Sequence, residues 1–93
     1  MNRLVLAAQL AERGALRYTP AGLPALDLTL KHESQVMQDG KARQVWFEIR
    51  ARAIGEITQR VALLDLGSTH GFAGFLGSQR NGKGVVFHIT ELD

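Results

Sequence analysis

The stretch from Arg17 to Leu30 constrains the fold of this chain most, because it combines a strand, a tight turn and a second strand. In the turn, Pro20 presets φ, and Gly22 can adopt the positive φ that many tight turns need. After the turn, apolar and polar residues alternate, as in a strand with one buried face, and the apolar positions are Leu26, Leu28 and Leu30. The segment therefore predicts β-structure on both sides of a turn.

Glycines and turn signals divide the rest of the chain into short segments, which is typical of all-β proteins. We expect five strands, the first of them kinked at Arg13–Gly14, at about residues 2–19, 23–32, 43–53, 69–79 and 84–91. A polar loop is expected over Glu33–Ala42, with Asp39–Gly40 as its turn signal. Asn81–Gly82 predicts a hairpin loop over Arg80–Lys83.

One segment has the spacing of a helix. Apolar side chains three or four residues apart predict a short helix within Ile54–Leu66, ended by Gly67; they are Ile54, Ile57, Val61 and Leu64. Five strands with a helix between the third and fourth predict an all-β fold, the five-stranded Greek-key barrel known as the OB (oligonucleotide-binding) fold, in a single domain over residues 1–93. The pattern alone also fits an SH3-like or another small barrel.

Composition and charge narrow the classes of function. The 93 residues carry 11 basic and 9 acidic side chains, and the net charge of +2 is too weak by itself to predict binding to nucleic acid. There is no cysteine, which excludes disulfides and thiolate metal sites. No apolar run is long enough to span a membrane and no secretory leader begins the chain, so we expect a cytoplasmic protein.

The chain shows no pattern typical of an enzyme. Its three histidines, His32, His70 and His88, are isolated and lack metal-ligand spacing, and no serine lies in a nucleophile motif. Residues 77–83 fit the spacing of a phosphate-binding loop, but Gly84 stands where that loop needs Ser or Thr, and a strand pattern follows instead of a helix. We therefore expect a protein without catalytic residues, metal or cofactor.

The expected third strand has one apolar and one polar face. Val45, Phe47 and Ile49 face inward, and the outward residues are Trp46, Glu48, Arg50 and Arg52. Trp46 is a candidate platform for stacking a nucleobase, and Arg50 and Arg52 are candidates for phosphate contacts. The alternative for Trp46 is burial in a subunit interface or under a loop.

Further candidates lie on the fourth strand and in the loop after it. Phe75 faces outward if Phe72 faces the core, and its alternative is burial in the core or an interface. Arg80 and Lys83 occupy a hairpin tip, where they are either solvated charges or phosphate contacts.

The order of several short motifs resembles the bacterial single-stranded-DNA-binding protein family. The motifs are the opening Asn2-Arg-Leu-Val-Leu, the turn Arg17-Tyr-Thr-Pro-Ala-Gly, Arg43-Gln-Val-Trp-Phe47 and the stretch Gly67–Leu76. None is highly specific alone, but together they touch most of the chain in the family's order. The resemblance implies the OB fold and not another small barrel.

The chain also resembles the primosomal replication protein N family (PriB), through Arg43-Gln-Val-Trp46 and Gly74-Phe75. The sequence reaches Asp93 just after the fifth expected strand and shows no Gly/Pro/Gln-rich tail, as in that family. The resemblance implies a homodimeric replication-restart accessory protein whose partners are single-stranded DNA, the PriA helicase and other primosome proteins. It also implies DNA contacts by the residues that match the family's aromatic and basic positions, which are Trp46, Phe75, Arg80, Lys83 and Arg43. An RNA-binding module and a protein-interaction adaptor are the alternatives.

Overall fold

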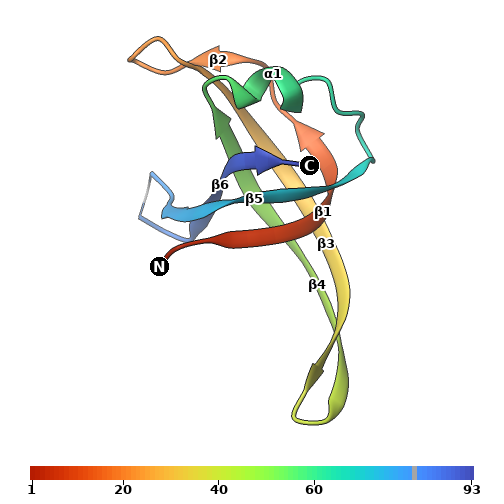
Figure 1. Ribbon diagram of the computed structural model, residues 1–93. Helices are drawn as coiled ribbons and strands as arrows, with labels where there is room; N and C mark the ends of the chain where they lie inside the picture. The colour runs from red at the N-terminus through yellow and green to blue at the C-terminus, as the bar shows by residue number, and fades with distance from the viewer. Residues whose placement is uncertain (81) are drawn as a thin grey trace.

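The computed structural model describes residues 1–80 and 82–93 and confirms the predicted OB fold. The barrel strands follow one another in the order β1 (Leu4–Arg13), β5 (Thr69–Ser78), β6 (Val85–Leu92), β4 (Lys41–Ile54) and β3 (Pro24–Gln38), and β3 pairs back onto β1 (Figure 1). This last pairing closes the barrel. An additional strand, β2 (Arg17–Tyr18), has two residues and pairs only with β3 among the described strands.

The residues predicted to face inward form or pack against the barrel core, except Val45, which lies half-buried on the arm opposite Ser34. The leucines of β3 and the small residues of β4 are buried, namely Leu26, Leu28, Leu30, Ala51 and Ala53. They belong to the same apolar cluster as Phe72 of β5 and Phe87 of β6, which are fully buried. Period-2 alternation was therefore sufficient to assign the buried face of these strands.

The polar loop predicted over Glu33–Ala42 is wrong. β3 and β4 continue in unbroken antiparallel register as far as Gln38 and Lys41, and Asp39–Gly40 alone form the turn. Both turn residues have positive φ, 51° and 75°, as a type I′ hairpin turn requires. The resulting arm projects from the barrel (Figure 1), and the exposed residues there lack the apolar alternation of a half-buried strand.

Two other boundaries also differ from the expectation. The first strand is interrupted, since β1 ends at Arg13 and the N–H of Gly14 donates to the carbonyl of Asp27 at 2.9 Å before β2 begins. Helix α1 (Ile57–Val61) confirms a helix between β4 and β5. It is shorter than predicted, because Ile54 belongs to β4 and Gly67, with φ of 90°, lies in the turn before β5. In the described part of the chain, no helix is long and apolar enough to cross a membrane.

The β5–β6 loop is closed by backbone hydrogen bonds on both sides of Asn81. The N–H of Gln79 donates to the carbonyl of Gly84 at 3.3 Å, and the N–H of Gly82 donates to the carbonyl of Gln79 at 2.9 Å. Asn81 and the Asn–Gly turn predicted on it lie outside the described residues. The strands on either side of the loop form the predicted hairpin.

Candidate nucleic-acid interface

The outward face of β4 carries the side chains that parity predicted there. Trp46 is 58% exposed, whereas Phe47 and Ile49 pack against the core. The antiparallel register places each outward residue of β4 opposite one of β3, in the pairs Trp46–Glu33, Glu48–Lys31, Arg50–Thr29 and Arg52–Asp27. The face is therefore a two-strand surface with an aromatic residue toward the arm and arginines toward the barrel.

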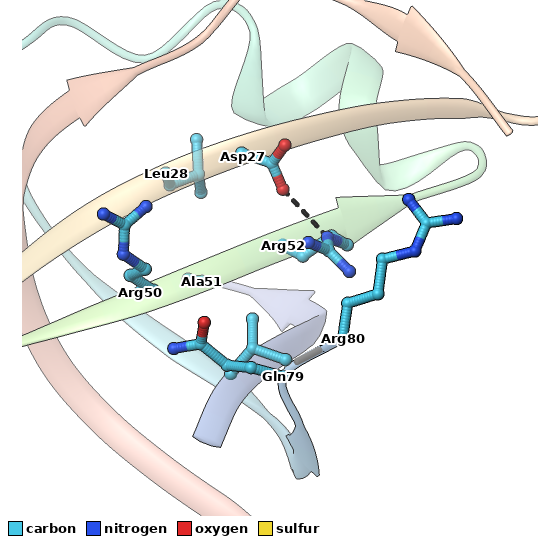
Figure 2. A pocket seen from close by; sticks show the side chains of 8 residues that line it. Asp27, Leu28, Arg50, Ala51, Arg52, Gln79 and Arg80 are labelled. Atoms are coloured by element: carbon cyan, nitrogen blue, oxygen red, sulfur yellow. Dashed lines mark hydrogen bonds and ion pairs between the residues drawn. The ribbon is translucent and has the colours of Figure 1, made fainter. Parts of the chain in front are cut away.

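Three of the predicted residues, Arg50, Arg52 and Arg80, line one cleft of about 270 Å³, which we call the arginine cleft (Figure 2). Gln79 adds a polar group to it. β6 pairs in parallel with the barrel part of β4, with Ala51 opposite Phe87, and this pairing brings the loop before β6 against the arginines of β4. Residues far apart in the sequence thereby form a single basic site.

Asp27 orients one side of the arginine cleft. Arg52 Nε donates to Asp27 Oδ1 at 2.8 Å, and Arg17 Nε donates to Asp27 Oδ2 at 3.0 Å. Partial burial raises the pKa of Asp27, but the hydrogen bonds and charges of the two arginines outweigh burial and lower the pKa below its ordinary value. The ionised carboxylate of Asp27 neutralises part of the positive charge of Arg17 and Arg52. By contrast, Arg50 and Arg80 form no ion pair within the described residues.

Phe75 faces outward, as strand parity predicted. It is 41% exposed and stacks on His88, with ring centroids 4.8 Å apart and planes inclined by 8°. His88 is paired in register with both Phe75 and Arg52. Burial, and after it the charge of Arg52, lowers the pKa of His88. A continuous row thus runs across four strands from Asp27 through Arg52 and His88 to Phe75.

Trp46 lines a different cleft, of about 440 Å³, which we call the tryptophan cleft. Its other lining residues come from β1, β3 and β5 and are Ala7, Ala8, Gln9, Lys31, Glu33 and Thr69. The structure therefore does not gather all predicted residues at one point. It places four of them, Trp46, Arg50, Arg52 and Arg80, in two clefts along the same face of β4 and the others outside both.

The remaining predicted residues line neither of these clefts. Arg43 is exposed on the arm, in register with Val36, and Lys83 is exposed in the bend before β6. Within residues 1–80 and 82–93, no three His, Asp or Glu side chains are placed to hold a metal ion.

Sequence reasoning missed Asp27, Glu33 and His88 as members of this surface. The signal for the first two was available, because a two-residue turn at Asp39–Gly40 pairs Gln38 with Lys41. Counting back along both strands from that pair places Asp27 opposite Arg52. The expectation of a long polar loop concealed this register. For His88, whose neighbours depend on the pairing of β6 with both β4 and β5, the sequence carried no such signal.

A closed barrel with two outward aromatic residues and a basic cleft on one face defines an OB-fold protein with a candidate surface for single-stranded nucleic acid. The model of a family described as "another single-strand binding protein family" matches residues 2–91. The chain is 46% identical over 92 residues to the replication restart protein PriB of Bordetella pertussis. The aligned region covers 98% of this chain and 86% of that protein.

Solved structures agree with these matches. PriB from Ralstonia solanacearum has a TM-score of 0.91 and 40% identity, covering 100% of this chain and 96% of that chain. The single-stranded DNA binding protein from Thermus aquaticus has a TM-score of 0.76 and 29% identity, covering 100% of this chain and 49% of that chain. The chain belongs to the single-strand binding protein family and, within it, to the PriB family.

Proposed function

We propose that this chain is a single-stranded-DNA-binding accessory protein of the replication-restart primosome, and that it stimulates the PriA helicase. The observation that carries the proposal is the outward face of β4, which presents an exposed Trp46 and the arginine cleft together on an OB barrel. The names of its relatives, replication restart protein PriB, support the same role.

On this proposal, the strand lies along the outward face of β4. Bases stack on Trp46 and Phe75, and phosphates contact Arg50 and Arg80, whose charges are not neutralised by an ion pair in the described structure. Arg52, held by Asp27, is the fixed wall of the arginine cleft. The further cations of the proposed path are Arg43 and Lys83.

The double variant Arg50→Ala/Arg80→Ala tests the phosphate contacts. Each contact to a single strand adds about −0.7 to the slope of log K against log salt, so losing two per chain should flatten the slope by at most about 1.4 per chain. Affinity should fall equally for all sequences, because phosphates carry no sequence information. Fluorescence anisotropy with labelled oligonucleotides across a salt series measures both quantities.

The control for this variant is Arg60→Ala. Arg60 donates to the carbonyl of Leu92 at 2.7 Å and lines neither the arginine cleft nor the tryptophan cleft, so its loss should leave the slope nearly unchanged. Equal slopes for the double variant and the wild type would place the DNA elsewhere. A wild-type protein that leaves unwinding by PriA unchanged in a helicase assay would contradict the proposed accessory role.

We also expect the protein to be a homodimer. On the outward side of the β1–β5 pair, Val5 is 67% exposed opposite Ala73, and a second copy would cover this apolar side chain. Dimerisation would also double the net charge of +2 available to the DNA. Sedimentation equilibrium should give about twice 10.2 kDa, and a monomer at micromolar concentration would contradict the expectation.

A further inference from the structure

The tryptophan cleft has a feature that binding to phosphates does not explain. Glu33, one of its lining residues, is exposed and forms no hydrogen bond or ion pair through its side chain in the described part of the chain. The other two carboxylates on this face are paired: Glu48 lies 4.0 Å from Lys31 Nζ, and Asp27 accepts from Arg17 and Arg52. An unpaired anion on a surface that receives a polyanion repels the phosphates, so a favourable contact for Glu33 on this surface must come from a hydrogen-bond donor.

The register shows where that partner would lie. Glu33 is directly opposite Trp46 on the neighbouring strand, and residues paired in this way have Cβ atoms about 4.5–5.5 Å apart. A carboxylate on a Glu side chain therefore reaches the edge of a base stacked on the indole. The small side chain of Ala7, an exposed lining residue of β1, leaves room in the cleft for the base.

The chemistry of the carboxylate selects among bases. An ionised carboxylate only accepts hydrogen bonds. Cytosine offers its N4 amino group and adenine its N6 amino group, whereas thymine presents the acceptor O4 at the corresponding position, beside its N3–H. A carboxylate placed at this exocyclic position would thus favour the amino group of cytosine over the O4 of thymine.

We propose that the tryptophan cleft is a base-reading site, in which Trp46 stacks the base and Glu33 accepts a hydrogen bond from its exocyclic amino group. The protein then prefers cytosine to thymine, two bases of the same ring size. This inference rests on the proposed function, since it requires single-stranded DNA on the face of β4.

The test compares labelled oligo(dC) and oligo(dT) of equal length by anisotropy, at one salt concentration and at a pH above neutrality where cytosine is unprotonated. Wild-type protein should bind oligo(dC) about fivefold or more tightly, because base-edge hydrogen bonds discriminate on this scale. In Glu33→Gln the preference should disappear, since an amide both donates and accepts and therefore suits either base.

The matched control is Glu48→Gln, which removes the same charge from the same two-strand surface but from a carboxylate already paired with Lys31. It should change the affinity for both oligomers by a common factor and preserve their ratio. Equal affinity of the wild type for the two oligomers, or a common shift in Glu33→Gln, would overturn the base-reading site and leave the proposed function standing. Failure of the wild type to bind either oligomer would overturn both.

Discussion

Replacing Trp46 with alanine is expected to weaken binding to oligo(dT) by about 1–3 kcal/mol, which corresponds to roughly a 5- to 150-fold loss of affinity. The indole is 58% exposed on the outward face of β4 and is the aromatic wall of the tryptophan cleft. A base stacked on it would lose that surface in the variant. The stability of the fold should change little, because the side chain lies outside the apolar core.

The control is Tyr18→Ala. Tyr18 is 66% exposed and also aromatic, but it lies on β2 and lines neither cleft, so its loss should leave the affinity within error of the wild type. Intrinsic fluorescence gives a second measurement, since Trp46 is the single tryptophan and oligo(dT) should quench it. Equal affinities of Trp46→Ala and wild type would remove Trp46 from the binding surface.

The second large effect is expected on stability, from Gly74→Ala. A Cβ at this position would lie well inside van der Waals distance of the carbonyl oxygen of His88, and 3.1 Å from the backbone nitrogen of Thr90. These are backbone atoms of β6 at the point where the β5–β6 register shifts, so they cannot rotate away as a side chain would. We expect a loss of about 3 kcal/mol in the free energy of unfolding, measured by urea denaturation.

Gly14→Ala provides the comparison for that variant. The nearest atom to a Cβ at residue 14 is the carbonyl oxygen of Asp27 at 3.6 Å, an ordinary contact. Stability should therefore stay the same or rise by up to about 1 kcal/mol, because alanine restricts the unfolded chain more than glycine does. Equal free energies of unfolding for the two variants would contradict the close approach of β5 and β6 at Gly74.

Strand parity was the most reliable prediction from the sequence alone. Phe47 and Ile49 alternate with Trp46 and Arg50, and the structure places the first pair inward and the second outward. The same reasoning placed Phe75 outward and Phe72 in the core. These predictions hold because the direction of a side chain in a strand is a local property of the pleated backbone.

Strand parity did not predict the arm formed by the ends of β3 and β4. Residues 34–38 and 41–45 form paired strands outside the barrel, stabilised by their backbone ladder and by a turn with positive φ at Asp39 and Gly40. Because neither face of the arm is buried in the barrel core, its residues need not alternate between apolar and polar. Their sequence therefore resembles that of a polar loop. Only the register shows Glu33 opposite Trp46, and with it the candidate base-reading site.

By itself, the sequence determined the inward and outward faces of the strands, the turn residues and the helix between β4 and β5, because each depends on neighbours a few residues away. The tertiary structure alone decided that Arg80 joins Arg50 and Arg52, and that Phe75 stacks on His88. Both contacts follow from closure of the barrel, where β6 pairs with β4 on one side and β5 on the other. Pairing between distant segments depends on packing of the whole core, which no local pattern encodes.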